Sequence, residues 1–334
     1  MRRLWSVALA LALAVAVPVL AACSTPTVGS ATVHDVAWVT TGASVTLPGT
    51  DVTPVRLPTR HVQPGVAVGS LPSALAYTAD GRGLLVVTQG DDTLHEIDPS
   101  THGVVHSAGV GVEPDAVAVA PGGTRGRGIA LVANLDSDDV TPVDLGTWRA
   151  GPPIPVGTEP VAIAVYTATS GAATAFVADF GSNAVTPIDL STMTAGTAIP
   201  VGPGPQTIAV ASGEVLVGNF GNRSLTPINA VTLAPGGAVA LPLNPTGIAI
   251  LPSGATAYVC GGSDVVAVTT IGLAVGAPVG LPAVAQGIAL TADGTTAWVT
   301  QQTGSVVPVT LATGKVGTPL RLGGHPSAIV IGAG

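Results

Sequence analysis

The sequence predicts an all-β protein, a seven-bladed β-propeller made of four-stranded antiparallel blades. Three observations predict this fold. The chain of 334 residues has few charged residues, 9%, and many turn formers, with 44 Gly and 29 Pro. A similar segment recurs every 40 to 46 residues, a period typical of one propeller blade. The last copy is incomplete, and its missing strands match the start of the repeated region.

Composition and charge exclude several classes of protein. Long amphipathic helices need charged faces and few helix breakers, so a helical fold is not expected. Hydrophobic residues make up 47% of the chain, which is too many for a disordered protein. The formal net charge is -8, from 11 Lys and Arg against 19 Asp and Glu, and no basic patch is present to hold phosphates. We therefore expect no nucleic-acid partner.

Each repeat opens on the same short pattern. A proline is followed two or three residues later by an aliphatic residue and an alanine, as Pro160 is followed by Ile163 and Ala164. This pattern predicts the first strand of a blade. We expect first strands to begin near Pro72, Pro114, Pro160, Pro205, Pro245, Ala285 and Pro326.

The remaining strands of a blade can be followed in the repeat that begins at Pro160. A second strand is expected over residues 175–178, a third over 186–189 and a fourth around 199–202. Glycine turns separate the strands, since glycine accepts the positive φ that tight hairpins need. The third strand carries a proline, which cannot donate a ladder hydrogen bond, so it should lie toward the edge of the blade.

The final repeat supplies only a first strand, over residues 327–331. The stretches 37–40, 51–55 and 66–69 match the second, third and fourth strands of other repeats. The two ends of the repeated region should therefore pair in one blade and close the ring, which removes open sheet edges. On this basis we assign residues 33–334 to the propeller domain.

The first 32 residues have the pattern of a targeting segment. Arg2 and Arg3 precede an apolar run over residues 4–20, the pattern of an export signal. The stretch Leu20-Ala21-Ala22-Cys23 resembles the lipobox of bacterial lipoproteins. The resemblance implies a signal peptide over 1–22, a lipidated Cys23 and a tether over 23–32, hence an extracytoplasmic protein anchored to the cell membrane. Ordinary secretion with cleavage after Ala22, or an uncleaved anchor, are the alternatives.

The repeats also resemble the YVTN-type β-propeller family. The resemblance rests on the strand Ala175-Phe176-Val177-Ala178, the loop Phe180-Gly181-Ser182-Asn183 and the strand Thr186-Pro187-Ile188-Asp189. It implies the propeller fold and says little about activity, although related seven-bladed propellers include lactonases. The chain departs from the family pattern at Cys260-Gly261-Gly262 and at Gln301-Gln302, which replace the usual Asn-containing loop.

Polar side chains should gather on one face of the ring, which we call the top face. It consists of the lead-in loops before each first strand and the loops between second and third strands. Ligand sites of propellers usually lie there, around the central channel. The candidate ligand-binding residues on this face are Glu113, Asn134, Asp136, Glu159, Asp179, Asn183, Asn219 and His325. The alternative is that these residues only form and solvate turns.

Three of these residues are candidates for a metal site. Asn134, Asp179 and Asn219 fall at equivalent positions of successive blades, and Ca²⁺ and Mg²⁺ prefer such oxygen ligands. A recurring turn preference would explain the same pattern, and no other cofactor is expected. His325 is the best single candidate for a general acid or base, with a turn role as the alternative. Cys260 is expected to be buried.

Two functions remain from the sequence. The first is a non-catalytic binding or scaffold module at the cell envelope, which is attached to the membrane by its lipid and recognises an envelope protein or a small ligand. The alternative is a metal-assisted hydrolase of a lactone or a similar small ester.

Overall fold

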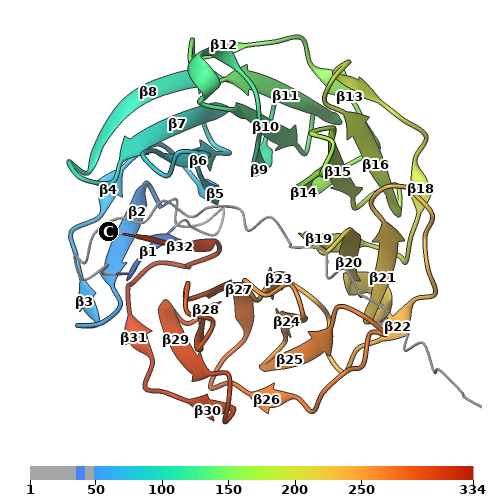
Figure 1. The fold of residues 1–334 in the computed structure, drawn as a ribbon. Helices are drawn as coiled ribbons and strands as arrows, with labels where there is room; N and C mark the ends of the chain where they lie inside the picture. The colour runs from blue at the N-terminus through green and yellow to red at the C-terminus, as the bar shows by residue number, and fades with distance from the viewer. Residues whose placement is uncertain (1–34, 42–48, 334) are drawn as a thin grey trace, which may run out of the picture. The chain divides into compact units, whose positions relative to one another are not determined.

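Seven small antiparallel sheets stand in a ring in the computed structural model, which confirms the seven-bladed β-propeller (Figure 1). The structure describes residues 35–41 and 49–333. The predicted signal peptide and lipobox, residues 1–23, lie outside the described residues. We number the blades 1 to 7 along the ring, starting from the blade that contains β1.

Blades 1 to 4 come first along the ring. Blade 1 contains β32 (Ile329–Ala333), β1 (Asp35–Thr40), β2 (Asp51–Arg56), β3 (His61–Val62) and β4 (Val66–Ala67). Blade 2 contains β5 (Pro72–Tyr77), β6 (Leu84–Thr88), β7 (Thr93–Asp98) and β8 (Gly103–Gly109). Blade 3 contains β9 (Pro114–Ala120), β10 (Ile129–Asn134), β11 (Asp139–Asp144), β12 (Arg149–Ala150) and β13 (Ile154–Pro155). Blade 4 contains β14 (Pro160–Thr167), β15 (Ala173–Asp179), β16 (Ala184–Asp189), β17 (Thr194–Ala195) and β18 (Ile199–Pro200).

Blades 5 to 7 complete the ring. Blade 5 contains β19 (Pro205–Ala211), β20 (Glu214–Asn219), β21 (Ser224–Asn229) and β22 (Val239–Ala240). Blade 6 contains β23 (Gly247–Ile250), β24 (Thr256–Gly261), β25 (Asp264–Thr269) and β26 (Val279–Gly280). Blade 7 contains β27 (Ala285–Leu290), β28 (Thr296–Gln301), β29 (Ser305–Thr310), β30 (Lys315–Val316) and β31 (Leu320–Arg321). Two short 3₁₀ turns, η1 (Thr124–Gly126) and η2 (Phe220–Asn222), lie in loops.

The first strand of each blade lines the centre of the ring (Figure 1). Five of these strands, β5, β9, β14, β19 and β27, begin with a shift in ladder register directly after their first residue. In β14, for example, Pro160 and Ala162 pair with Asp179 and Ala178, and Val161 between them pairs with neither. In β23 and β32 the ladder starts beyond this point. These two strands therefore begin at Gly247 and Ile329, past the prolines at 245 and 326.

The outer strand is divided into two short pieces in most blades, and the fourth strand predicted around residues 199–202 corresponds to the second piece in blade 4, β18. In blade 3, Pro142 at the centre of β11 accepts a hydrogen bond from Gly151 N at 2.7 Å but has no N–H to return. The outer chain pairs with β11 on either side of this position, through β12 and β13. Blade 6 has Ala267 at this position and its outer chain follows the same course.

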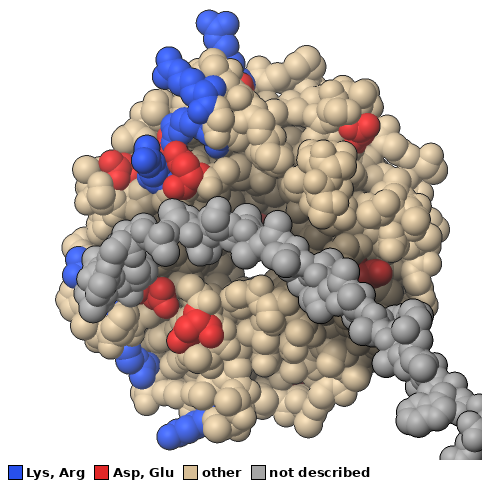
Figure 2. Space-filling model, viewed as in Figure 1, with Lys and Arg blue, Asp and Glu red and all other residues tan. Residues whose placement is uncertain are grey.

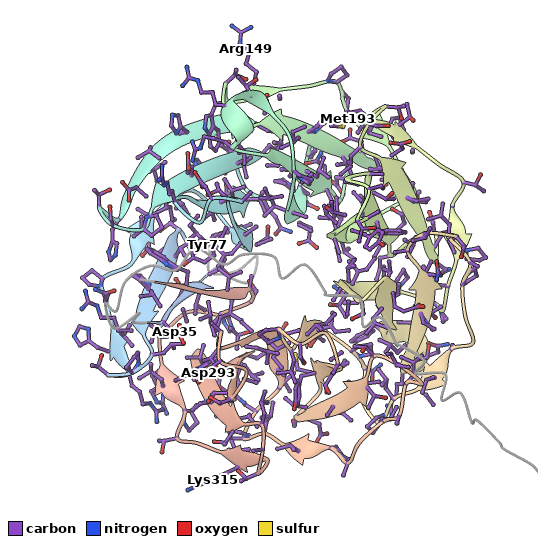
Figure 3. All side chains as sticks on the ribbon, viewed as in Figure 1. Asp35, Tyr77, Arg149, Met193, Asp293 and Lys315 are labelled. Carbon is purple, nitrogen blue, oxygen red and sulfur yellow. The ribbon has the colours of Figure 1, made fainter. Side chains whose placement is uncertain are left out.

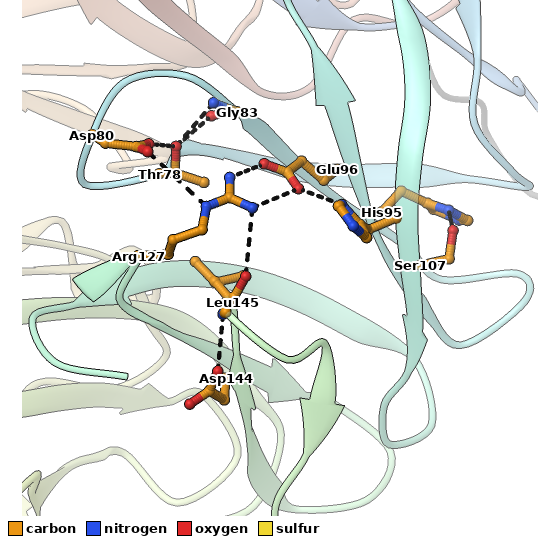
Figure 4. A network of polar contacts seen from close by, with 11 residues as sticks. Thr78, Asp80, Gly83, His95, Glu96, Ser107, Arg127, Asp144 and Leu145 are labelled. Carbon is orange, nitrogen blue, oxygen red and sulfur yellow. Dashed lines mark hydrogen bonds and ion pairs between the residues drawn. The ribbon is translucent and has the colours of Figure 1, made fainter. Parts of the chain in front are cut away.

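Blade 2 is the exception: Glu96 occupies the position of that proline, and the outer strand β8 spans seven residues. The Glu96 side chain is buried and forms an ion pair with Arg127 of blade 3 (Figure 4). It also accepts a 2.9 Å hydrogen bond from His106 Nδ1, and the His106 ring stacks on Trp148 of blade 3. A Cβ at Gly83 would overlap Glu96 Oε1, so glycine makes room for the carboxylate. This network joins blades 2 and 3.

The ring is closed by the two ends of the propeller, as the sequence predicts. β1 pairs with β32 antiparallel, from Asp35 with Ala333 to Val39 with Ile329. Trp38 of β1 is 1% exposed and packs in a buried cluster with side chains of blade 2. Tyr77 of blade 2 lies near the inner end of the junction between blades 1 and 2 (Figure 3), where it packs on Gly332 so closely that a Cβ there would overlap its ring.

We expect Trp38→Ala to destabilise the whole propeller, because the cavity would form where the closing blade meets blade 2. Removal of a buried Trp costs about 3–5 kcal/mol. Denaturant unfolding should show this loss as one cooperative transition at lower denaturant. Trp148→Ala is the matched control, since Trp148 is only partly buried at the rim. Equal losses in the two variants would contradict the importance of the closing junction.

Candidate functional site

A cavity of about 860 Å³ lies at the centre of the ring, and each blade contributes the same position to its wall. That position is the residue directly after the first-strand proline or its equivalent. In five blades it falls in the ladder shift described above, where its side chain is released from the pairing pattern. Bulges often re-aim a side chain in this way near functional sites. We call these residues the bulge ring: Ser73, Asp115, Val161, Gln206, Thr246, Gln286 and Ser327.

Below the bulge ring the wall is mostly apolar, with Thr207 as a polar residue. The residue two positions further along each first strand is aliphatic, and in most blades it is buried. These residues are Leu75, Val117, Ile163, Ile208, Ile248, Ile288 and Ile329. Toward the top face, loops of blades 5 to 7 complete the wall with Phe220, Asn244, Gly262, Val284 and Gln302. The cavity thus opens on the top face and combines a polar rim with an apolar floor, as small-molecule sites commonly do.

Asp115 is the one ionisable side chain that lines this cavity among the described residues. Gln89 Nε2 donates a 2.8 Å hydrogen bond to Asp115 Oδ1. Burial raises the pKa of Asp115 to about 6, with a smaller contribution from the like charge of Glu113. The carboxylate is therefore ionised at neutral pH and has a neutral amide as its partner. A perturbed carboxyl group in a cavity is a functional-site candidate on physical grounds.

The three predicted metal-binding residues lie at the ends of β10, β15 and β20, fully buried, and they do not line the cavity. Each bonds to a threonine of its own blade: Asn134 Nδ2 donates to Thr141, Asn219 Nδ2 donates to Thr226, and Thr186 donates to Asp179. One oxygen of each remains without a partner among the described residues. The structure therefore uses these residues separately, one in each blade, and does not bring them together.

Two acidic candidates occupy strained turn positions. Glu113 and Glu159 have φ of 50° and 53°, and their backbone N–H groups donate to Asp92 and Asp138 of the preceding blade. Asn183 makes the same contact to Gly204 N at 2.8 Å. Such contacts bind each lead-in loop to the blade before it.

The other two candidates are exposed, and Cys260 is buried. Asp136 and His325 both lie on the top face in contact with solvent. His325 Nδ1 lies 3.2 Å from the carbonyl oxygen of Gln302, so it stands beside the mouth of the cavity. The burial of Cys260 is confirmed at 0% exposure, and burial raises the pKa of its thiol to about 12.

The bulge ring was not predicted from the sequence, because the candidate site residues were chosen among charged and amide residues of the loops. The bulge ring is chemically varied, so no single residue type marks it. The sequence nevertheless contains a signal: the residue directly after the first-strand proline or its equivalent is polar in six of the seven blades. In a first strand, the face that packs in the interior is normally apolar. Polar residues at the same position of six blades therefore indicate that these side chains have a different environment.

The charges are divided unequally between the two faces. Cations are prominent at the rim of the ring in the view of Figure 2, and Figure 3 shows Arg149 and Lys315 pointing outward there. Among the described residues, the cations on the top face are Arg223 and Arg321. Its acidic residues are Asp51, Asp91, Asp92, Glu113, Asp115, Asp136, Asp138, Asp139, Glu159, Asp179 and Asp264. A concave surface of this sign concentrates cations and repels anions.

The described residues contain no group of three or more His, Cys, Asp or Glu side chains placed to hold a metal ion. Within the same part of the chain, no helix is long and apolar enough to cross a membrane.

Comparisons with known proteins support the fold. No family model and no curated protein matches the chain. Among solved structures, hydrazine synthase of Kuenenia stuttgartiensis is similar with a TM-score of 0.69 and 19% identity, covering 78% of this chain and 89% of that one. A protein of unknown function from Desulfotomaculum acetoxidans has a TM-score of 0.77 and 16% identity, covering 89% and 98%. A candidate 6-phosphogluconolactonase from Bacteroides uniformis has a TM-score of 0.70 and 14% identity, covering 90% and 99%.

We expect Asp179→Asn to stabilise the protein at neutral pH. Burial raises the pKa of Asp179 to about 6, so the native state holds its proton more tightly than the unfolded chain does. That contribution is complete below about pH 4 and is lost as the pH rises through 6, at a cost of about 3 kcal/mol. Asparagine occupies the equivalent position in blades 3 and 5 and does not ionise.

Chemical unfolding at pH 4 and pH 7.5 measures this effect. The variant should exceed the wild type in stability at pH 7.5 and lose most of that advantage at pH 4. Asp136→Asn, at an exposed position, is the control and should show little pH-dependent difference. An equal effect of Asp179→Asn at both pH values would contradict the assignment.

Proposed function

We propose that this protein is an exported, lipid-anchored β-propeller that binds a small ligand in its central cavity at the cell envelope. The observation that supports this most directly is the bulge ring. Each blade directs one side chain from the same strand position into one cavity with an apolar floor. Amide and hydroxyl groups spaced around such a rim can orient a ligand, while the floor gives binding energy through burial.

The predicted targeting segment and the resemblance to the repeat family belong to the same proposal. The lipobox-like stretch that ends at Cys23 would place the propeller outside the cytoplasm and hold it at the membrane. The YVTN-like repeats would place it among propellers found on surfaces and in exported proteins. A binding module is the role that fits both features.

A phosphorylated substrate fits the cavity poorly. Its lining contains no Lys, Arg or His among the described residues, and the surrounding top face is acidic. Phosphate groups are normally held by cations or by helix N-termini. The resemblance in fold to a candidate 6-phosphogluconolactonase is therefore not a reason to give this chain the same substrate.

A second candidate function is hydrolysis of a lactone or similar small ester, and Asp115 is the observation that favours it. A carboxylate with a pKa of about 6 can accept a proton from an attacking water. Ca²⁺ or Mg²⁺ would assist by polarising the lactone carbonyl. The three residues predicted to hold the ion lie buried in separate blades, so this part of the alternative lacks a common ligand set.

Cys23→Ser should release the protein from the membrane. A thioether-linked lipid cannot form on serine, so the variant is expected in the soluble extracytoplasmic fraction while the wild type sediments with membranes. Fractionation followed by immunoblotting measures the distribution. Continued sedimentation of the variant would contradict lipid anchoring and favour an uncleaved apolar anchor.

Val161→Trp should abolish ligand binding without unfolding the protein, because it fills the cavity from a half-buried bulge-ring position. Thermal unfolding across a collection of small metabolites tests this. A ligand at about 100 times its dissociation constant stabilises the wild type by about 2.7 kcal/mol and should not stabilise the variant. Val112→Trp, at an exposed top-face position outside the cavity, is the matched control.

A further variant, Asp115→Asn, separates binding from hydrolysis when it is compared with these proteins. Lactone turnover that is lost in Asp115→Asn would favour the hydrolase. Ligands that stabilise Val161→Trp as much as the wild type would overturn the cavity as the binding site.

A further inference from the structure

We propose that the central cavity recognises an organic monocation, an ammonium group carried on an apolar body, with Asp115 as its counter-ion. This inference rests on the proposed function, because it assigns the chemical class of the ligand to the same cavity.

The first step is the missing partner of Asp115. Its one hydrogen bond among the described residues comes from the neutral amide of Gln89, on Oδ1, and none is made by Oδ2. The nearest charge that acts on it is Glu113, which has the same sign. Asp115 is half-buried in the cavity wall, and partial loss of hydration makes a nearby cation favourable for its carboxylate. The described cavity wall supplies no cation, so we infer that the ligand supplies it.

The second step is the arrangement of the other lining groups. Gln206 and Gln286 belong to the same bulge ring as Asp115, and they add neutral amide groups, which can accept hydrogen bonds from a cation, to the polar part of the wall. Below them the wall is mostly aliphatic, which suits an apolar body. At the mouth, Phe220 is 40% exposed, and an aromatic ring in this place can attract a cation by a cation–π interaction.

The third step excludes divalent metal ions and anions as the ligand of this cavity. A divalent ion such as Ca²⁺ takes six to eight oxygen ligands, usually with several carboxylates, whereas the described cavity wall has one. An anion would meet no positive side chain there and would cross an acidic top face to enter. A cation is attracted by that same face.

The test compares matched probes on the full-length protein in detergent. Benzyltrimethylammonium and benzylamine are the cationic probes, benzyl alcohol is the neutral one, benzoate is the anion and CaCl₂ supplies the metal. Ligand-observed NMR titration gives each dissociation constant at the millimolar level. The proteins are the wild type, Asp115→Asn, the exposed control Asp136→Asn and the cavity-filling Val161→Trp.

We expect the cationic probes to bind more tightly than benzyl alcohol, and benzoate not to bind. Asp115→Asn should weaken the cations about tenfold and leave benzyl alcohol within about twofold, since asparagine keeps the shape and can still bond to Gln89. Asp136→Asn should change cation binding by less than about twofold. Val161→Trp should remove binding of every probe.

Two other results would overturn the inference in distinguishable ways. If benzyl alcohol or benzoate binds best, and Val161→Trp still removes binding, the cavity is a ligand site of another chemistry and only the cation assignment fails. If CaCl₂ binds through Asp115 and displaces the amines, the site is a metal site and the assignment also fails. If probes bind equally to Val161→Trp, or none binds to the wild type, the proposed function fails with it.

Discussion

Each blade presents apolar surface to both of its neighbours, and the rest of the structure depends on this constraint. The buried clusters join adjacent blades, as Leu131 of blade 3 packs with Ile163 of blade 4. A single blade would leave both surfaces in water, and an open row would leave two of them exposed at its ends. Pairing of β1 with β32 satisfies the constraint for the last junction. The ring therefore requires that sequence segments about 290 residues apart meet, which makes its closure a long-range and demanding step in folding.

Closure also determines where a site can lie. Seven first strands converge on one axis, and a proline or its equivalent begins the ladder of most of them. Proline restricts the backbone and removes one donor, and the register shift behind it frees the next side chain from the pairing pattern. The same local event, repeated around the ring, produces a cavity wall whose chemistry can differ at each blade. The site is thus a consequence of repetition, and its specificity comes from the differences among repeats.

The fold was predictable because its signals are local and repeated: the period, the turn glycines and the unpaired last strand all stand in the sequence. The site was less predictable. Asn134, Asp179 and Asn219 share a position and an oxygen chemistry that suggest a metal, yet each bonds to a threonine of its own blade. The ion pair of Glu96 with Arg127 joins residues of different repeats, and no spacing rule indicates it. Residues of the bulge ring share only a strand position, so register, a property of the folded sheet, was needed to find them.

The contrast between these two sets of residues separates scaffold from site. A side chain that repeats its chemistry and bonds within its own blade is explained by the blade alone. Asp115 is not explained in this way, because serine, threonine, glutamine or valine occupies the same position in the other blades. A carboxylate there, partnered by a neutral amide, opposes folding at neutral pH through desolvation, and asparagine would keep the hydrogen-bonding shape without that cost. A destabilising charge in the wall of the cavity is therefore better understood as a group that serves ligand binding than as one that holds the ring together.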